Sequence, residues 1–240
     1  MASNGLLVIG SGPGIGATTA SLFTQKSFSK VALISRDKTR LCKDRDTILK
    51  AANFADKTVE IEVWSVDITN TKAFTTVLKE TEKFATFNCV LFNAARVEPS
   101  DLLTFPEEEI LKDFKTPHAN KSLQKTTTIA LYTTAQWALP LLSALEPADK
   151  PSILITSSLL PREPVPFVFS LSLVKAAQRN LVQSLAMTNP DVHIALLNVG
   201  GLVSWDDRWF NPPAIARKFW ELYEQEKDAW TLDLDLLAEA

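Results

Sequence analysis

The segment GSGPGIG, residues 10–16, has the residue types and spacing that most directly predict binding chemistry. Its four glycines, Gly10, Gly12, Gly14 and Gly16, follow an apolar run and precede a segment of helical character. Glycines let the backbone approach a phosphate group closely, and the free N–H groups of a helix N-terminus favour negative charge. The segment predicts an anion-binding turn between a strand and a helix; the alternative is a tight turn that binds nothing.

Short apolar, β-branched runs alternate with longer amphipathic segments along the 240-residue chain. Strands that are apolar almost throughout and separated by helices are typical of a parallel sheet covered on both faces. The sequence therefore predicts an α/β fold, a Rossmann-type doubly wound parallel sheet, as a single domain over residues 1–240. The expected strands are 6–10, 31–35, 59–66, 88–93, 152–157, 192–199 and a short final one at 231–237; the expected helices include 14–25, 71–84, 126–145 and 171–188. A polar segment, 115–125, has no expected element.

Further motifs stand at the ends of these strands, and together with the glycine turn the chain resembles the short-chain dehydrogenase/reductase family. The glycine spacing Gly10-xxx-Gly14-x-Gly16 is similar to that family's turn, as are VDIT with Asp67, FNAA at 92–95 and NVGGLVS at 198–204. The resemblance covers essentially the whole chain and implies a nicotinamide dinucleotide. The cofactor-binding residues that it implies are Gly10, Gly12, Gly14, Ile15, Gly16, Ser35, Arg36, Asp67, Ile68, Asn93, Ala94, Ala95, Lys175, Gly200, Leu202 and Ser204.

The end of the second expected strand bears on the choice of dinucleotide. NAD sites place an acid there to bind the ribose 2′-hydroxyl, whereas arginine attracts a 2′-phosphate and a carboxylate repels it. This chain has Ser35 and Arg36 at that point, with Asp37 one residue further. The sequence predicts NADP(H) rather than NAD(H), unless Asp37 binds the ribose instead.

The catalytic residues of the family are a serine on the fifth strand, a tyrosine and a lysine one helical turn apart, and an asparagine in the preceding helix. The resemblance assigns the serine to Ser158 and the lysine to Lys175, but it places Leu171 at the tyrosine and Thr127 at the asparagine. Leucine has no proton to donate, and general acid catalysis is typically worth about 10²–10⁴ in rate. Carbonyl reduction would therefore need another acid.

The loop PREPVPF, residues 161–167, offers two candidate replacements: Glu163 as an acid and Arg162 as an electrostatic partner. Three tryptophans, Trp205, Trp209 and Trp220, cluster around the expected helix after the cofactor loop, which in the family forms the lid over the substrate. Aromatic residues on such a lid would suit a bulky apolar or aromatic substrate. The alternative for the tryptophans is ordinary packing.

These motifs favour an NADP(H)-dependent oxidoreductase with an atypical catalytic set, acting on an apolar or aromatic secondary metabolite. If the acceptor is an imine or iminium, the missing acid is no handicap, because hydride transfer to an iminium gives a neutral product. Two other classes stay open: a non-redox isomerase or cyclase that uses the same fold, and a cofactor-binding protein without turnover.

Composition limits the partners further. The net charge is −3, the basic residues are scattered, and the two cysteines, Cys42 and Cys89, have no metal-ligand spacing. We expect a soluble, cytoplasmic protein with a small-molecule substrate and without a metal, nucleic-acid or membrane partner. The family resemblance also implies a homodimer or homotetramer formed by helices 126–145 and 171–188.

Overall fold

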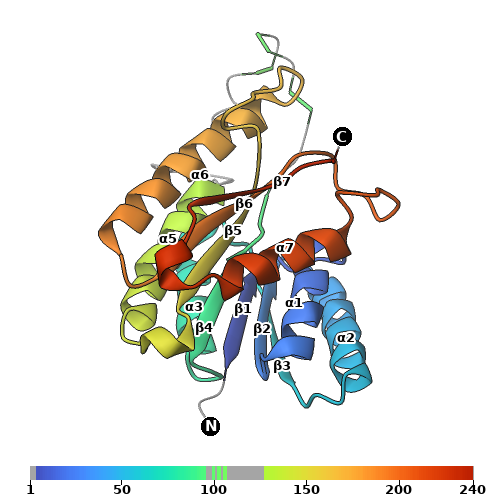
Figure 1. Ribbon diagram of the computed structural model, residues 1–240, viewed down its shortest axis with the longest axis vertical. Coiled ribbons are helices and arrows are strands. Elements are labelled where there is room, and N and C mark those ends of the chain that lie inside the picture. Colours follow the sequence, from blue (N-terminus) through green and yellow to red (C-terminus); the bar gives the residue numbers. More distant parts are fainter. Residues whose placement is uncertain (1–3, 96–98, 101, 104, 107–126, 240) are drawn as a thin grey trace.

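Seven parallel strands form one twisted sheet in the computed structural model, which describes residues 4–95, 99–100, 102–103, 105–106 and 127–239 (Figure 1). The strand order is β3-β2-β1-β4-β5-β6-β7. Strands β2 and β3 are added on one side of β1, and β4 to β7 are added on the other side, so the order reverses between β1 and β4. Ligands of such sheets bind outside the carboxyl ends of the strands at this reversal. The strands are β1 (Gly5–Ile9), β2 (Lys30–Ser35), β3 (Glu60–Ser65), β4 (Phe87–Phe92), β5 (Ser152–Ser158), β6 (His193–Val199) and β7 (Asp233–Leu236).

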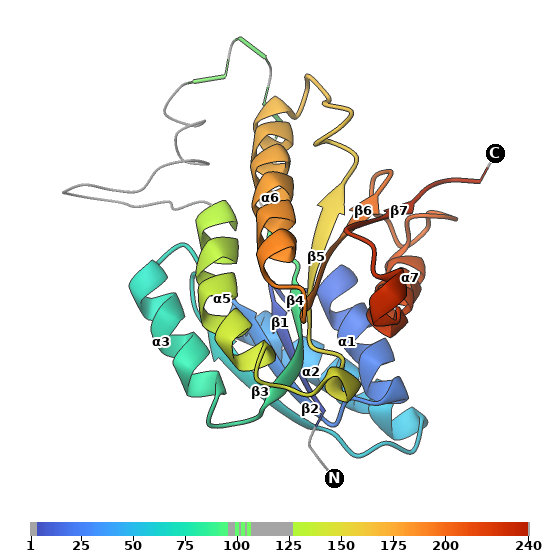
Figure 2. The ribbon, with the colours of Figure 1, turned by 60° about the vertical axis from the view of Figure 1, so that its left-hand side comes forward.

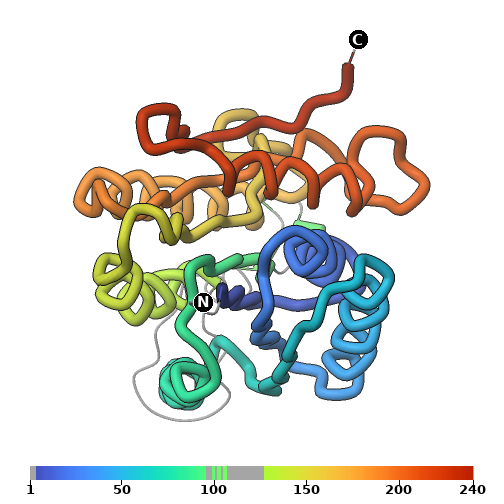
Figure 3. Tube along the Cα trace, turned by 60° about the horizontal axis from the view of Figure 1, so that its bottom comes forward, coloured from blue at the N-terminus to red at the C-terminus, as the bar shows by residue number. Residues whose placement is uncertain are grey.

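Helices cover both faces of the sheet, as Figure 2 shows. One face carries α1 (Ile15–Lys26), α2 (Lys38–Phe54) and α7 (Pro212–Glu224), and the other carries α3 (Thr71–Thr81), α5 (Thr127–Leu142) and α6 (Phe169–Thr188). Seen from below, the last helix α7 lies beside the first helix α1 (Figure 3). Two short 3₁₀ helices, Pro147–Asp149 and Lys227–Ala229, complete the described elements. The predicted doubly wound α/β fold is confirmed.

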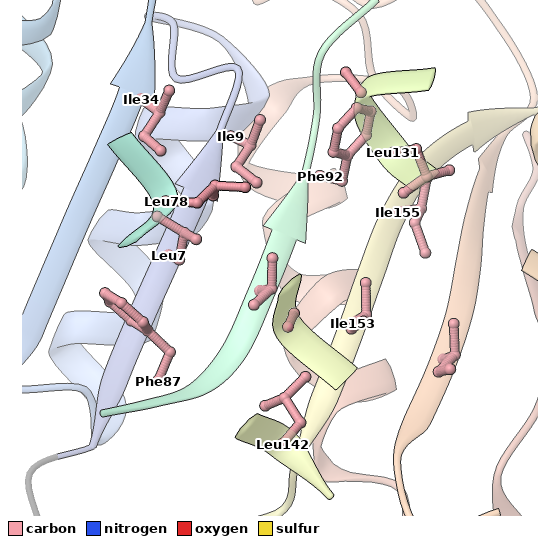
Figure 4. Close-up of a cluster of buried hydrophobic side chains, with 14 of the residues drawn as sticks. Leu7, Ile9, Ile34, Leu78, Phe87, Phe92, Leu131, Leu142, Ile153 and Ile155 are labelled. Carbon is pink, nitrogen blue, oxygen red and sulfur yellow. The ribbon is translucent and has the colours of Figure 1, made fainter. Parts of the chain in front are cut away.

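Two apolar cores, one on each face, explain the continuous apolar runs of the central strands. Alternate residues of a strand point to opposite faces, so Leu7 and Ile9 join the core under α3, α5 and α6, while Leu6 and Val8 join the other. Figure 4 shows the first core, with side chains from β1, β4 and β5 beneath the helices. A strand buried on both sides cannot alternate polar with apolar residues.

Three helices begin with a side-chain cap, and α1 does not. Asp37, Asn70 and Asn211 accept hydrogen bonds from backbone N–H groups in the first turns of α2, α3 and α7. The residue before α1 is Gly14, which has no side chain to offer. The first turn of α1 therefore keeps backbone N–H groups for another partner.

The segment 115–125 lies outside the described residues. Among the helices that are described, none is long and apolar enough to cross a membrane.

Candidate cofactor and active site

The glycine turn between β1 and α1 is shaped by two different demands on its glycines. Gly10 has a φ of +89°, and a Cβ on it would lie 2.6 Å from the backbone nitrogen of Ala94. This close contact allows the end of β1 to pack against the residues that follow β4. A Cβ on Gly12 or Gly14 would meet nothing within 4 Å, so these two border open space.

The turn fits a dinucleotide pyrophosphate on these observations. The uncapped N-terminus of α1 supplies donors and positive dipole potential, and the open space next to Gly12 and Gly14 leaves the backbone accessible to phosphate oxygens. Ile15 and Gly16 form the first turn of α1, where their N–H groups have no acceptor within the helix.

A buried carboxyl group on α2, that of Asp44, accepts a hydrogen bond from the glycine turn. The sequence analysis did not identify it. The Ser11 hydroxyl donates to Asp44 Oδ2 at 2.8 Å, and both residues are at least 95% buried. Burial raises the pKa of Asp44, against the lowering effects of the Ser11 hydrogen bond and of Arg40. Asp44 lies within α2, far from any motif, so the sequence carried no sign of this contact.

The two residues that follow β2, Arg36 and Asp37, have different hydrogen-bond partners. Asp37 caps α2 by accepting a hydrogen bond from the Arg40 N–H at 3.0 Å, so its carboxylate has a structural task. Arg36 is exposed, and its backbone carbonyl accepts from the Ser65 hydroxyl at 2.9 Å, which ties it to the end of β3. The guanidinium is left to face the solvent beside the carboxyl edge. Ser35, the last residue of β2, pairs with Ser65.

Asp67 follows β3 and forms a local turn. Its Oδ1 accepts from the N–H and the hydroxyl of Thr69, at 2.9 and 2.7 Å, while the residue as a whole is exposed. The next residue, Ile68, is buried in the core under α3. This turn places an acceptor and a backbone segment at the same edge of the sheet as the glycine turn.

A chain of hydrogen bonds connects the glycine turn to the expected catalytic lysine. Asn93 Nδ2 donates to the Gly10 carbonyl at 3.0 Å, and Asn93 Oδ1 accepts from the Thr156 hydroxyl at 2.8 Å. The Thr156 carbonyl in turn accepts from Lys175 Nζ at 2.8 Å. Ends of three strands and α6 are thus linked, with Ala94 and Ala95 following directly. Thr156 is a further residue that sequence reasoning missed.

Lys175 is 94% buried, and burial lowers its pKa to about 8. Leu171 lies one helical turn before it on α6 and Gln178 one turn after, so the three share a face. Gln178 is buried, and its Nε2 donates to the Thr127 hydroxyl at 3.2 Å. The site face of α6 therefore carries an apolar residue, an ammonium group and an amide.

The two serines at the end of β5 differ in their surroundings. Ser158 Oγ accepts a long hydrogen bond, 3.4 Å, from the Leu160 N–H and is half-buried. Ser157 is 4% exposed, and its hydroxyl has no partner among the described residues.

The loop after Ser158 directs its arginine to the edge of the sheet. Arg162 Nη2 lies 2.7 Å from Asp235 Oδ1 on β7, and Asn198 also donates to that oxygen at 2.9 Å. Burial raises the pKa of Asp235, but the hydrogen bonds from Arg162 and Asn198 lower it by more, so this pKa lies below its usual value. Arg162 is thus engaged by β7, while Glu163 is exposed at the start of the same loop.

The loop after β6 is anchored at its beginning and exposed further on. Gly200 packs against β7, where a Cβ would lie 2.8 Å from the Leu236 carbonyl oxygen. Leu202 and Ser204 are exposed. Trp205 is 59% exposed.

The other two tryptophans differ from one another. The ring of Trp209 lies under the Arg208 guanidinium, 4.5 Å from it. Trp220, on α7, packs against Phe23 of α1 and Tyr223 of α7, with ring centroids 5.1 and 5.4 Å away. This is the ordinary packing given above as the alternative, and the expected place of Trp220 on a lid is wrong. The described residues contain no cluster of histidine, cysteine, aspartate and glutamate that could hold a metal ion.

Comparison with known proteins agrees with this architecture. The family model described as short chain dehydrogenase matches residues 4–202, so the chain belongs to the short-chain dehydrogenase family of oxidoreductases. No curated protein sequence matches the chain.

Solved structures share the fold at low sequence identity. An alcohol dehydrogenase from the archaeon Thermococcus sibiricus, complexed with 5-hydroxy-NADP, has a TM-score of 0.80 at 20% identity, covering 97% of this chain and 95% of that one. A short-chain dehydrogenase from Rhodopseudomonas palustris has a TM-score of 0.77 at 21% identity, covering both chains fully. The NADPH-bound short chain oxidoreductase from Pseudomonas aeruginosa PAO1, which contains an atypical catalytic center, has a TM-score of 0.76 at 19% identity, covering 99% and 98%.

Proposed function

We propose that the protein is an NADP(H)-dependent oxidoreductase in which Leu171 stands at the position of the family's catalytic tyrosine. The observation that carries the proposal is the carboxyl edge of β1 and β2. There an uncapped helix N-terminus borders open space at the glycine turn, Arg36 faces solvent, and Asp37 is occupied as a helix cap. The bound dinucleotide would supply hydride chemistry, and the residues of this chain would bind and orient it.

In this proposal the turn and the first residues of α1 would hold the pyrophosphate, Arg36 would bind the 2′-phosphate, and Asp67 and Ile68 would hold the adenine. Asn93, Ala94 and Ala95 would line the site next to the turn, and Gly200, Leu202 and Ser204 would bind the nicotinamide end. Two solved relatives of the fold are described with NADPH or a hydroxy-NADP, which supports this choice, while an NADH-dependent reductase of the same fold is described with NAD.

At the chemical end, Lys175 and Ser158 are the retained polar groups. The Lys175 ammonium, held by the Thr156 carbonyl, is the charged donor that we assign to the substrate and the nicotinamide ribose. Ser158 would hold the acceptor group. Because Arg162 is paired with Asp235, we assign it to holding the loop, and Glu163 is the remaining acid of that loop.

The substrate class we propose is an apolar or aromatic secondary metabolite, with an imine or iminium as the acceptor. Exposed Leu202 and Trp205 beyond β6 and half-exposed Val165 and Phe167 after β5 support an apolar substrate. An isomerase or cyclase that does not use redox chemistry is the second candidate, favoured by Leu171, because leucine cannot supply the proton that carbonyl reduction requires.

The test is binding of NADPH and NADH to the purified protein, read by tryptophan fluorescence, followed by NADPH oxidation with ketones and with cyclic imines. Tighter binding of NADPH with turnover on imines is the expected result. Turnover on ketones alone would contradict the imine proposal and point to Glu163. Binding without turnover would favour the isomerase or a protein without catalysis, and no binding would contradict the cofactor role.

We also propose that residues 1–240 are one dinucleotide-binding domain and that it forms a homodimer or homotetramer through α5 and α6. Tyr132 and Leu141 on α5 and Leu173 on α6 expose between 41% and 49% of their surface, which supports an apolar contact there. A monomer in light scattering at micromolar concentration would contradict this assembly.

A further inference from the structure

The carboxyl group of Asp44 contacts the turn that would hold the phosphates. Only 2% of Asp44 is exposed, and its Oδ2 accepts a hydrogen bond from the Ser11 hydroxyl at 2.8 Å. Ser11 precedes Gly12, which borders open space. A carboxylate in this position would repel a pyrophosphate on the turn, and the repulsion is stronger where protein rather than water separates the charges. A charged Asp44 therefore opposes a bound dinucleotide.

The surroundings of Asp44 do little to keep its carboxyl group charged. Buried charges are normally paired and hydrogen-bonded. Within the described residues, the Ser11 hydroxyl is the hydrogen-bond donor to this carboxyl group, and no ion pair forms with it. Burial raises the pKa of Asp44, and the lowering effects of the Ser11 hydrogen bond and of Arg40 are smaller. Asp44 is therefore easier to protonate than an ordinary aspartate.

The charged groups on the neighbouring elements do not change this balance. Helix α2 packs against α1, β2 and β3 (Figure 1). On its own face of α2, Asp44 has Arg40 one turn earlier and the helix cap Asp37 beyond it. The remaining charged residues of these elements are Lys26 at the far end of α1, then Lys30, Glu60 and Glu62, which their strands direct to the opposite face of the sheet, and the exposed Arg36 and Asp67 after β2 and β3.

The hydrogen bond between Ser11 and Asp44 can survive a change of charge. A hydroxyl group can donate or accept, and a protonated carboxyl group gains a donor of its own. With Asp44 ionised, Ser11 donates to it. With Asp44 neutral, the carboxyl group can donate to Ser11 Oγ, and the Ser11 proton is released for another acceptor. The turn keeps its contact with α2 in both states, while the charge behind it differs by one unit.

We propose that Asp44 determines how tightly the turn binds the dinucleotide: the complex forms with a neutral Asp44, so that binding takes up a proton and weakens as pH rises. This role rests on the proposed dinucleotide binding. It adds a residue from within α2 to a cofactor site whose expected members belong to the glycine turn, the strand ends, the loops after them and Lys175.

The proton balance involves no covalent change in the dinucleotide. As the dinucleotide binds, the Asp44 carboxylate takes one proton from solvent and forms an O–H bond, and the proton returns to solvent on dissociation. By linkage, the factor by which the dinucleotide increases the proton affinity of Asp44 is also the factor by which protonation increases the dinucleotide affinity. One coupled proton makes Kd rise by at most about tenfold per pH unit.

The experiment is isothermal titration of the purified protein with NADP⁺ from about pH 5 to about pH 8, in two buffers of different ionisation enthalpy at each pH. It gives both Kd and the number of protons taken up. The parent should take up more protons than Asp44→Asn does, by roughly 0.3 to 1 at the maximum. The Kd of the parent should also rise with pH relative to that of the variant.

Asp44→Asn removes the charge, whereas it keeps an acceptor for the Ser11 hydroxyl and nearly the same side-chain volume. It should bind NADP⁺ more tightly than the parent at the alkaline end, an effect that damage to the turn would not produce. The 2′-phosphate also titrates, with a pKa of about 6, but its contribution is the same in both proteins and cancels in the difference. Asp46→Asn, at an exposed position of α2, is the matched control and should behave like the parent.

Infrared difference spectra provide a second readout. The C=O stretch of a protonated carboxyl group should appear when the parent binds NADP⁺ and should be missing in Asp44→Asn. If Asp44→Asn fails to fold, Ser11→Ala carries the test. Without the hydroxyl the Asp44 carboxylate loses its donor, so the proton uptake should move to higher pH than in the parent.

The two proposals fail separately. NADP⁺ binding with the same proton uptake and the same pH dependence in the parent and in Asp44→Asn would overturn the role of Asp44 and leave the dinucleotide site intact. A parent protein that binds neither NADP⁺ nor NADPH at any pH would overturn the dinucleotide site itself, and the role of Asp44 with it.

Discussion

The two halves of the carboxyl edge differ in how their chemistry is encoded. At the ends of β1 and β2 the site is made of backbone: a glycine turn, an uncapped helix and short loops. At the end of β5 and on α5 and α6 the site is made of side chains, and there we infer that Leu171 and Thr127 stand at the positions of the family's tyrosine and asparagine. A backbone site tolerates few changes, because its shape depends on every glycine that approaches another chain segment. A side-chain site can lose one group while the others stay in position.

The hydrogen bonds between the halves explain how the second can change without loss of the first. Asn93 and Thr156 connect the Gly10 carbonyl to Lys175 through groups that do not involve residue 171. The lysine is therefore positioned by the sheet rather than by a neighbouring tyrosine. Four substitutions test this contrast, from the largest expected effect to the smallest.

Replacing Gly10 with valine should abolish dinucleotide binding and destabilise the fold. The Cβ would lie 2.6 Å from the Ala94 nitrogen, and the φ of +89° is strained for a β-branched residue. Thermal unfolding and NADPH titration measure the two effects. The Cβ of Gly12→Ala would meet nothing within 4 Å, so this variant should fold like the parent. It should nevertheless bind NADPH more weakly than the parent does. A Gly10→Val protein that binds normally would refute the backbone account.

Restoring the family residue with Leu171→Tyr should increase ketone reduction at neutral pH by about 10²–10⁴, the usual value of a general acid. The new hydroxyl would lie one helical turn before Lys175. Met187→Tyr, at an exposed position near the end of the same helix, is the matched control and should have no effect. Steady-state kinetics with a ketone series provide the measurement, and an unchanged rate would mean that residue 171 does not face the substrate.

Lys175→Met should stabilise the protein at pH 7 because it removes a buried charge. The folded pKa of about 8 lies below the ordinary 10.5, so the unfolded chain binds the extra proton between these values. The parent's penalty is thus complete below about pH 8, on the order of 3 kcal/mol, and it is relieved as pH rises toward 10.5. Urea unfolding at pH 7 and near pH 10 should show the advantage of Lys175→Met shrinking.

The control for that experiment is Lys43→Met on the exposed side of α2, which should show no such pH dependence. An equal stability difference at both pH values would mean that Lys175 is protonated alike in the folded and unfolded states.

Arg36→Ala should weaken NADPH binding by roughly tenfold and leave NADH binding unchanged, because the guanidinium would contact only the 2′-phosphate. Isothermal titration at low and high salt measures the difference, which should diminish as salt screens the charges. Arg45→Ala is the control, since that side chain pairs with Asp46 on α2. Equal losses for both dinucleotides would instead indicate a role in folding the loop.

Sequence reasoning predicted the elements well where the pattern was local. The strands lie within two residues of their expected ends, because each is an apolar run bounded by turn residues. The helix expected at 171–188 begins two residues earlier, at Phe169. The edge strand β3 was also expected, although its alternating Glu60 and Glu62 belong to a half-exposed strand.

The sequence by itself determined the glycine turn, the alternation of strands and helices that predicts a doubly wound sheet, and the identity of residue 171, because each depends on residues close together in the chain. Only the tertiary structure decided which side chains meet. Asp44 reaches Ser11 from within α2, Thr156 joins Asn93 to Lys175, and Arg162 turns to Asp235. These partners are 19 to 73 residues apart in the sequence. Their contacts depend on how helices and strands pack, and no local pattern of residues encodes that packing.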